Sequence, residues 1–423
     1  MTVSCTPSVL GGKIRAISSK SDAHRILICA SLCDKATKIS CNVMSKDIAA
    51  TIDCLKMMGT DISVNDDLIT VVPRQFNKKA DIDCGESGST LRFLMPLVSA
   101  LGIDTTISGS GRLPQRPISP LKEEMERKGV TFHTDNMFPL HLTGQLQSGV
   151  YEIKGNVCSQ FITGLLLALP LLNGDSIVKI LPPFESKSYV DITIAVIRKF
   201  GVEIIEEENN YIIKGSQKFV SPEEIKVEGD WSNASFLLCA GALSEKGVTV
   251  TGLDVNSPQG DKKILDVLTS MGADVEIADN EITVKKNKLN AVIVDANDIP
   301  DAVPAISVVA SVSKGETKII NAGRLRIKES DRIKSVVEML NAVGGCAEET
   351  DDGLVVKGKT DLQGGVVNGY NDHRIVMSAS ILSTLCKEGV VISDSNAVKK
   401  SYPDFFADFN KMGGNANVIN DRG

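Results

Sequence analysis

The sequence predicts an α/β protein of two domains, each built from three copies of one βαβαββ unit. Six glycines each end a predicted helix and precede an alternating strand. They are Gly59, Gly129, Gly201, Gly272, Gly344 and Gly413, so the intervals are 70, 72, 71, 72 and 69 residues. A unit of about 70 residues therefore repeats six times. With 423 residues, the chain is long enough for more than one core, at roughly 100 to 200 residues per domain.

Each unit also opens in the same way, with a polar helix start followed by an apolar helix. The apolar helices are expected over residues 26–32, 91–101, 161–172, 236–243, 303–312 and 375–385. Because these helices are apolar nearly all round, we expect them to be buried. The second helix of each unit, such as residues 47–58, is amphipathic and is expected to face water.

The two ends of the chain indicate how the repeats close. The sixth copy is short of a closing strand, whereas residues 1–10 have strand composition and no helix of their own. We therefore expect one domain over residues 13–227 and a second over residues 1–12 and 228–423, with two crossings that form a hinge. If the buried helices of each half are parallel, their N-termini point into the cleft between the halves, where the dipoles favour anions. We expect the active site in that cleft.

Composition excludes several classes of partner. The chain is 42% hydrophobic and 23% charged, with a formal net charge of -7, which argues against nucleic acid or an anionic membrane as the main partner. The N-terminus has no basic-then-apolar signal segment, and the longest apolar run, residues 165–172, contains Pro170. We expect a soluble, cytoplasmic protein.

The cysteines and histidines give no sign of a metal site. The ten cysteines are scattered singly and are expected to be reduced core thiols. The four histidines, His24, His133, His141 and His373, have no ligand spacing. The sequence therefore predicts no bound metal.

The first helix start combines cations with hydroxyls. Ser19 or Ser21 can cap the helix that begins here, and Lys20 and Arg25 flank the exposed backbone N–H groups. Such a site favours an anion. An ordinary capped surface helix with two solvated cations fits residues 19–25 equally well. Further cations adjoin other unit starts or strand ends: Arg112, Arg116, Lys187, Lys328, Arg332, Arg374, Lys399 and Lys400. Arginine suits a bidentate grip on phosphate or carboxylate.

Two carboxylates lie among these cations. Asp301 precedes an apolar helix, and Glu329 lies between Lys328 and Arg332. A carboxylate held among cations in a water-poor cleft is a candidate proton carrier. The alternatives are a helix N-cap for Asp301 and a surface salt bridge for Glu329.

Nine motifs, in order over nearly the whole chain, resemble the 5-enolpyruvylshikimate-3-phosphate (EPSP) synthase family. They are Ser19-Lys20-Ser21 with Arg25, Gly88-Ser89-Thr90 with Arg92, Gln115-Arg116-Pro117-Ile118, Ser159-Gln160-Phe161, Tyr189-Val190-Asp191-Ile192-Thr193, Ile299-Pro300-Asp301, Lys328-Glu329-Ser330-Asp331-Arg332, Asn371-Asp372-His373-Arg374 and Ser401-Tyr402-Pro403-Asp404. The resemblance implies a two-domain inside-out α/β barrel. It also implies transfer of the enolpyruvyl group of phosphoenolpyruvate to shikimate 3-phosphate, with release of phosphate, in aromatic amino-acid biosynthesis. It implies no cofactor, a monomer, and inhibition by glyphosate.

The resemblance assigns roles to residues of both halves. Shikimate 3-phosphate would be bound by Ser21, Arg25, Ser159, Gln160, Ser186, Tyr189 and Lys328. Phosphoenolpyruvate would be bound by Lys20, Gly88, Arg116, Gln160, Arg332, Arg374 and Lys400. Asp301 would take the proton of the attacking hydroxyl, and Lys20 and Glu329 would protonate the methylene carbon and reverse that step.

Three positions depart from the family pattern. Cys158 stands where many members have a serine, which removes a hydroxyl contact to the sugar phosphate. Glu86 and Arg324 each replace an asparagine. Glu86 would place a negative charge near an anionic substrate unless it turns away, so neither residue is assigned to the site.

Two other functions compete with this interpretation. The sister transferase that acts on UDP-N-acetylglucosamine has a reactive cysteine in the loop that spans residues 110–116 here, and this loop contains none. Six repeats could also build a scaffold without catalytic activity. A scaffold would not need Asp301, Glu329 and several arginines directed at one place.

Overall fold

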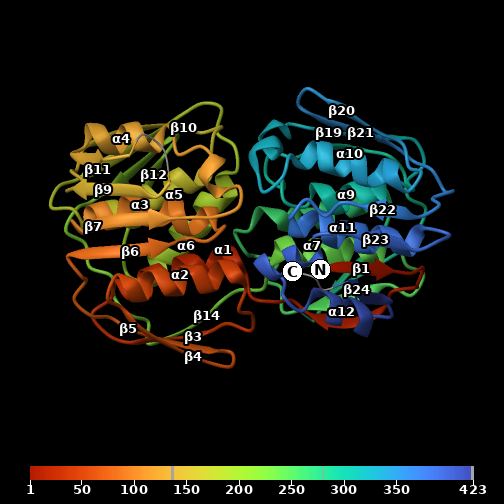
Figure 1. Cartoon of the computed structure of the whole chain (residues 1–423), viewed down its shortest axis with the longest axis horizontal. Helices are drawn as coiled ribbons and strands as arrows, with labels where there is room; N and C mark the ends of the chain where they lie inside the picture. Colours follow the sequence, from red (N-terminus) through yellow and green to blue (C-terminus); the bar gives the residue numbers. More distant parts are fainter. Residues whose placement is uncertain (135–137, 280, 421–423) are drawn as a thin grey trace. The chain divides into compact units, whose positions relative to one another are not determined.

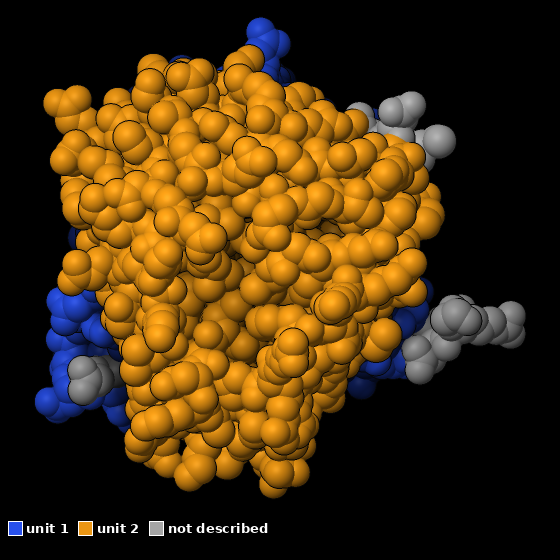
Figure 2. Space-filling model, turned by 90° about the vertical axis from the view of Figure 1, so that its left-hand side faces the viewer, with its two compact units in different colours: residues 1–17, 228–423 blue, residues 18–227 orange. Residues whose placement is uncertain are grey.

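A computed structural model describes residues 1–134, 138–279 and 281–420. The chain divides into two compact units (Figures 1 and 2): unit 1 contains residues 1–17 and 228–423, and unit 2 contains residues 18–227. Residues 13–17, expected with residues 18–227, lie in unit 1 because the strand Gly12–Arg15 pairs with Val248–Thr251 of that unit.

Unit 2 contains three four-stranded sheets among the described residues. In spatial order, the first sheet contains β14 (Glu224–Lys226), β3 (Thr37–Ser40), β5 (Leu68–Val72) and β4 (Asp61–Asn65). The second contains β6 (Lys79–Asp83), β7 (Asp104–Ser108), β9 (Leu140–Gly144) and β8 (Val130–Phe132). The third contains β10 (Val150–Lys154), β11 (Ser176–Leu181), β13 (Asn210–Ile213) and β12 (Ile204–Glu207). The helices are α1 (Lys20–Ser31), α2 (Lys46–Met57), α3 (Gly88–Ala100), η1 (Leu113–Gln115), α4 (Leu121–Arg127), α5 (Ser159–Ala168), η2 (Leu169–Leu171) and α6 (Lys187–Lys199).

Unit 1 repeats the same order in three further sheets of the described chain. The first contains β2 (Gly12–Arg15), β15 (Val248–Thr251), β17 (Glu281–Lys285) and β16 (Asp274–Ala278). The second contains β18 (Ile293–Asp295), β19 (Glu316–Ile320), β21 (Gly353–Lys357) and β20 (Ala347–Thr350). The third contains β22 (Gly365–Val367), β23 (Val390–Ile392), β1 (Thr2–Cys5) and β24 (Ala416–Asn420). Its helices are α7 (Trp231–Ala242), η3 (Gly260–Lys263), α8 (Ile264–Met271), α9 (Val303–Ala310), η4 (Gly323–Ile327), α10 (Arg332–Ala342), α11 (His373–Leu382), η5 (Ser383–Leu385), η6 (Ser395–Lys400) and α12 (Phe405–Lys411).

Every sheet has the same pairing. The first two strands are parallel and the other two join antiparallel, as in β10, β11, β13 and β12. In two sheets the first strand is exchanged: β14 pairs with β3 of the first repeat, and β2 pairs with β15 of the fourth. The N-terminal strand β1 lies between β23 and β24 and completes the last sheet.

The predicted helix ends are found at the repeated glycines. All six glycines have a positive φ, for example 96° at Gly272, which is the C-cap of α8. Left-handed backbone of this kind is accessible to glycine without strain. The six repeats therefore share the backbone conformation at the helix end as well as the glycine itself.

The six apolar helices are buried. In unit 2 these are α1, α3 and α5, and in unit 1 they are α7, α9 and α11 (Figure 1). Helices α3 and α5 pack closely at Gly164, where a Cβ atom would overlap the carbonyl oxygen of Arg92. The amphipathic α2 buries only one face, which includes Ile48, Ile52 and Leu55.

The cysteine prediction is wrong at two positions. All ten thiols are free and eight are buried, but Cys158, the N-cap of α5, is half-buried and Cys346, directly before β20, is exposed. Within the described ranges there is no cluster of three or more His, Cys, Asp or Glu side chains arranged to hold a metal ion. Among the helices described, none has the length and apolar character needed to cross a bilayer.

Candidate functional site

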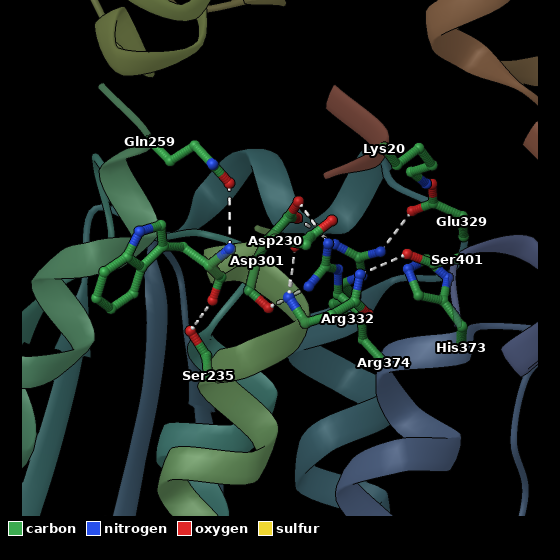
Figure 3. A network of polar contacts seen from close by, with 12 residues as sticks. Lys20, Asp230, Ser235, Gln259, Asp301, Glu329, Arg332, His373, Arg374 and Ser401 are labelled. Atoms are coloured by element: carbon green, nitrogen blue, oxygen red, sulfur yellow. Dashed lines mark hydrogen bonds and ion pairs between the residues drawn. The ribbon is translucent and has the colours of Figure 1, made fainter. Parts of the chain in front are cut away.

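Five charged residues of unit 1 form one network of ion pairs, which we call the Arg332 cluster. Its members are Asp301, Glu329, Arg332, Asp372 and Arg374. Figure 3 labels all of them except Asp372. They come from two neighbouring repeats of the chain: Asp301, Glu329 and Arg332 from the fifth, and Asp372 and Arg374 from the sixth. Arg332 begins α10 and Arg374 is the second residue of α11, while Asp301 precedes α9 and Glu329 follows η4.

The local sequence places these side chains at helix starts. Asp331 caps α10 by accepting a hydrogen bond from the N–H of Lys334, and Asp372 caps α11 by accepting from the N–H of Arg374. Aspartate is a favoured N-cap because its side chain satisfies an N–H group that has no partner within the helix. The two caps thereby fix where the arginines of the following turn emerge.

Arg332 holds three carboxylates at once. Its Nη1 donates to Asp301 Oδ1 (2.7 Å), its Nη2 to Glu329 Oε2 (2.6 Å) and its Nε to Asp372 Oδ2 (2.8 Å). The side chain is only 2% exposed. Burial alone would lower the pKa of Arg332, but Asp372, Glu329 and Asp301 outweigh it and raise that pKa. Arg332 therefore stays charged and bridges three carboxylates.

Arg374 grips the same aspartate from a second direction. Its Nη2 donates to Asp301 Oδ2 (2.9 Å) and its Nη1 to the carbonyl oxygen of Asp301 (3.0 Å). Lys400, predicted for the same ligand, donates from Nζ to the carbonyl oxygen of Asn371 (2.6 Å), next to the Asp372 cap. The predicted unit 1 residues are thus brought together.

Asp301 is ionised and strongly acidic in this arrangement. Burial would raise its pKa, but Arg374, Lys328 and Arg332 outweigh burial and hold the pKa well below its usual range. The pKa of Lys328 is lowered, mainly by burial, although Asp301 opposes the shift. The N-cap of α9 is Ala302, whose side chain makes no cap bond. Asp301 is therefore not a helix cap; its contacts are with the arginines.

Asp372 belongs to the cluster although it was expected only as part of the motif Asn371-Asp372-His373-Arg374 and not as a site residue. It is fully buried and accepts from Arg332 Nε, from the N–H of Arg374 and from Ser330 Oγ (2.9 Å). One carboxylate thus fixes both arginines. The available signal was its position directly before a buried helix that starts with His373 and Arg374.

Asp261, on η3, is a second acid that the sequence did not reveal. Its side chain is buried, and its pKa is raised from 3.8 to about 7 by burial first and then by the charge of Asp301, with Arg374 opposing. The acid therefore shares the electrostatic environment of the Arg332 cluster. No local pattern marks Asp261, because η3 belongs to a different repeat from Asp301 and Arg374.

In unit 2 the predicted residues form small groups at the starts of α1, α3, α5 and α6. Arg25 is buried, and its Nε donates to Thr193 Oγ1 (2.8 Å) while its Nη2 donates to the carbonyl oxygen of Tyr189 (2.9 Å). Its Nη1 donates to the carbonyl oxygen of Ser21. Burial lowers the pKa of Arg25 to about 10, with Asp22 opposing. Arg25 thus ties α1 to α6.

Gln160 and Gly88 lie beside two arginines. Arg92 Nη1 donates to Gln160 Oε1 (2.9 Å), and Gln160 Nε2 donates to Ser89 Oγ (2.8 Å). A Cβ atom built on Gly88 would lie 2.6 Å from Arg92 Nη1 and 2.7 Å from Arg116 Nη1. The absence of a side chain at Gly88 is what lets both guanidinium groups approach the first turn of α3. Arg92 was quoted as part of a motif but not assigned to the site.

The remaining predicted residues of unit 2 lie at helix starts. Lys20 pairs with Asp47 Oδ2 (2.8 Å). Ser159 is the first residue of α5, and Ser186 precedes α6 with a left-handed backbone (φ 53°). Tyr189 donates its backbone N–H to the carbonyl oxygen of Ser186. Ser19, rather than Ser21, caps α1 by accepting from the N–H of Asp22.

The three departures from the family pattern have defined positions. The Cys158 thiol is directed at Gln160 Oε1 (3.5 Å) and makes no cap bond to α5. The Glu86 carboxylate lies against Gly111, so a side chain at that glycine would collide with it. Arg324 donates to the carbonyl oxygen of Asn297 and contributes to the lowered pKa of Lys328.

The raised pKa of Asp261 predicts a specific pH dependence of stability. Between about pH 4 and pH 7 the Asp261 carboxyl keeps its proton in the native state, whereas the same carboxyl has lost its proton in the unfolded chain. The free energy of unfolding therefore falls as pH rises through this range. Above about pH 7 Asp261 is ionised in both states, and the whole decrease is present. Asn in place of Asp261 removes that decrease. We expect Asp261→Asn to raise the Tm relative to wild type by an amount that grows from pH 5 to pH 8, measured by thermal unfolding. Asp266→Asn, an exposed change on α8, is the control, and a constant difference for Asp261→Asn would contradict the assignment.

Named relatives match nearly the whole chain. The family model for EPSP synthase (3-phosphoshikimate 1-carboxyvinyltransferase) matches residues 5–409. The 3-phosphoshikimate 1-carboxyvinyltransferase of Clostridium novyi is 44% identical over 423 residues and covers 96% of each chain. The enzyme of the same name from Clostridium kluyveri is 43% identical over 416 residues, or 97% of each chain.

Solved structures share the fold. An EPSP synthase from Acinetobacter baumannii superposes with a TM-score of 0.83 at 23% identity, over 99% of this chain and 100% of that one. The enolpyruvyl transferase NikO from Streptomyces tendae gives 0.81 at 19% identity, over 98% of both chains. These likenesses confirm the predicted mixed α/β fold, and the match of the family model together with the identity to the clostridial enzymes establishes that the chain belongs to the EPSP synthase (3-phosphoshikimate 1-carboxyvinyltransferase) family.

Proposed function

We propose that this protein transfers the enolpyruvyl group of phosphoenolpyruvate to the 5-hydroxyl of shikimate 3-phosphate and releases phosphate, in the shikimate pathway of aromatic amino-acid biosynthesis. Membership of the family supports the reaction. The observation that carries it in the structure is Asp301, a half-buried carboxylate that pairs with two arginines. A proton acceptor next to cations that suit phosphate and carboxylate is what the reaction requires.

We also propose the finer architecture: an inside-out α/β barrel in each of two three-repeat domains, acting as a cytoplasmic monomer without a cofactor. The identical strand order of the sheets, three in each unit of the described chain, supports the repeat. The net charge of -7 supports small anionic substrates, held by locally clustered cations, over nucleic acid.

Shikimate 3-phosphate is assigned to residues that lie mainly at helix starts of unit 2. Ser159, Ser186 and Lys328 bind the sugar phosphate, and Ser21, Arg25, Gln160 and Tyr189 surround the ring and its carboxylate. The positions of Ser159 in the first turn of α5 and of Ser186 directly before α6 support this assignment, since backbone N–H groups at a helix start bind phosphate. The half-buried Cys158 supplies a backbone N–H there but no hydroxyl.

Phosphoenolpyruvate is assigned to Lys20, Gly88, Arg116, Gln160, Arg332, Arg374 and Lys400. The approach of Arg116 to Gly88 supports one part of this set, and the Arg332 cluster supports the other. Side-chain N–H groups of Arg332 and Arg374 donate to Asp301 and Glu329. A bound anion would compete with these carboxylates for the arginines.

This competition would change the basicity of Asp301, whose pKa is lowered by Arg374, Lys328 and Arg332. A carboxylate with a strongly lowered pKa is a weak base. When the phosphate or carboxylate of phosphoenolpyruvate takes over N–H groups of Arg332 and Arg374, the positive field at Asp301 is partly neutralised and its pKa rises toward the ordinary range. Substrate binding thus makes Asp301 a better proton acceptor.

The reaction then proceeds by addition and elimination. The 5-hydroxyl oxygen bonds to C2 of phosphoenolpyruvate as its proton passes to Asp301, and C3 receives a proton from Lys20 or Glu329, which gives a tetrahedral intermediate. Loss of phosphate from C2 and of a proton from C3 restores the double bond in the enolpyruvyl ether. The contact of Glu329 with Arg332 supports its place beside the reacting carbon.

The first test distinguishes the proposed reaction from its alternatives. We expect phosphate release when the purified protein is mixed with phosphoenolpyruvate and shikimate 3-phosphate, and none with UDP-N-acetylglucosamine in its place. Release with the nucleotide sugar would favour the sister transferase, although no cysteine lies in residues 110–116. No release with either acceptor would favour a scaffold without catalytic activity.

A second prediction separates binding from catalysis. Asp301→Asn removes the proton acceptor and also one competitor for the arginine N–H groups, so we expect kcat to fall by roughly 10²- to 10⁴-fold while KM for phosphoenolpyruvate does not rise. Steady-state kinetics measure both constants. Asp298→Asn, which removes a carboxylate paired with Lys263 in the same loop, is the control and should keep near-normal kcat. A normal kcat for Asp301→Asn would refute the assignment.

A third prediction concerns Gly88. The sequence-based expectation is that Gly88→Ala weakens glyphosate far more than phosphoenolpyruvate, because the inhibitor is longer. The structure adds that the new methyl must displace the guanidinium groups of Arg92 and Arg116, so we expect a loss for both ligands, at roughly 1 to 3 kcal/mol for overpacking, with the greater loss for glyphosate. The Ki of glyphosate and the KM of phosphoenolpyruvate, measured for both proteins, test this. Unchanged constants would exclude Gly88 from the site.

A further inference from the structure

A chain of four buried polar side chains crosses unit 2 outside the residues used in the proposed mechanism. His24 Nδ1 lies 2.7 Å from Thr51 Oγ1, Thr51 Oγ1 lies 2.7 Å from Thr90 Oγ1, and Thr90 Oγ1 donates to Ser87 Oγ at 2.7 Å. The four residues are at most 1% exposed. They join the first helix, α1, through α2 to the start of α3.

Proton counting gives the direction of this chain. A hydroxyl has one proton. Thr90 Oγ1 donates its one hydrogen bond to Ser87 Oγ, so the bond between Thr51 and Thr90 must be donated by Thr51. Thr51 then has no further hydrogen to donate. The short contact between Thr51 Oγ1 and His24 Nδ1 therefore requires Nδ1 to carry a hydrogen and to donate it. The chain therefore selects the Nδ1–H tautomer of His24.

The other side of the imidazole supports a neutral ring. Nε2 of His24 is buried and has no hydrogen-bond partner within the described chain, and the ring meets Phe93 of α3 edge to face at 6.3 Å. Burial, followed by the charges of Lys20 and Arg25, lowers the pKa of His24 well below its ordinary value. The imidazole therefore does not titrate near neutral pH, and its Nδ1 remains a donor.

The chain ends at the cap of α3. Ser87 Oγ accepts from the N–H of Thr90 (3.3 Å) as well as from the Thr90 hydroxyl, and Gly88 is the next residue. We propose that His24 is a positioning residue, which fixes the Ser87 cap and hence the backbone N–H groups at Gly88 through Thr51 and Thr90. The consequence for phosphoenolpyruvate affinity rests on the proposed function; the hydrogen-bond chain does not.

The tautomer is the first readout. In protein labelled with ¹⁵N-histidine, two-bond ¹H–¹⁵N correlation spectra distinguish the tautomers, and loss of a signal in His24→Asn assigns it among the four histidines. We expect His24 to be the Nδ1–H tautomer and not to titrate between pH 5.5 and 8. An Nε2–H tautomer, or titration in that range, would overturn the proposed chain.

The second readout tests the link to Gly88. Thr90→Val removes the hydroxyl at nearly constant shape. Thr90→Ser keeps the hydroxyl and is the first control. Thr105→Val is the second control, because it removes a buried hydroxyl elsewhere in unit 2 that donates to the carbonyl oxygen of Ile103. We expect faster amide hydrogen exchange of residues 87–92 in Thr90→Val, but not in Thr90→Ser or Thr105→Val. Equal exchange in all three variants would refute the positioning role, whether or not the protein proves to be the proposed enzyme.

Kinetics complete the test in the active protein. For Thr90→Val we expect KM for phosphoenolpyruvate to rise about 5- to 30-fold, which corresponds to the loss of one buried hydrogen bond. KM for shikimate 3-phosphate should stay unchanged within about twofold. In Thr90→Ser we expect KM for phosphoenolpyruvate to return to the wild-type value. Thr51→Val should reproduce the effect and shift the His24 signal. Equal increases in both KM values would indicate a general packing defect and refute the proposal. A wild type without phosphate release would refute the proposed function instead, and the exchange experiment would still decide the positioning role.

Discussion

The burial of helices that are apolar on every side is the constraint on which the rest of this structure depends. Helices such as α5 and α9 are covered all round, so charged groups can be placed only near their ends. At the N-terminal ends, unpaired N–H groups and the helix dipole favour carboxylate caps and bound anions. The concentration of polar and charged residues at helix starts follows from the hydrophobic core.

Burial then requires the cations to be neutralised. Arg332 and Arg374 are nearly inaccessible to solvent, and an isolated buried charge costs several kcal/mol. Asp301, Glu329 and Asp372 meet that requirement. Asp301 and Glu329 are half-buried, whereas Asp372 is fully buried and also caps α11. On the proposed function, an anionic ligand would therefore compete with Asp301 and Glu329 but not with Asp372.

Much of the fold was readable from local patterns. The glycines at each helix end recur because only their left-handed backbone stops the helix and enters the hairpin, as the positive φ at Gly272 confirms. The strand β1 was expected to complete the last repeat, and it lies between β23 and β24. Among site residues, Asp301, Glu329, Arg332 and Arg374 were identified from a family motif and are brought together by the structure.

The sequence by itself therefore determined the repeat, the buried helices and the residue types at their starts, because helix periodicity, caps and glycine stops act over a few residues. Only the tertiary structure decided that β2 and β14 exchange sheets, that Asp372 fixes both arginines, and that Asp261 and the chain from His24 to Ser87 lie where they do. These features join residues of different repeats. Their energies depend on burial and on hydrogen-bond distances, which no local pattern of residues specifies.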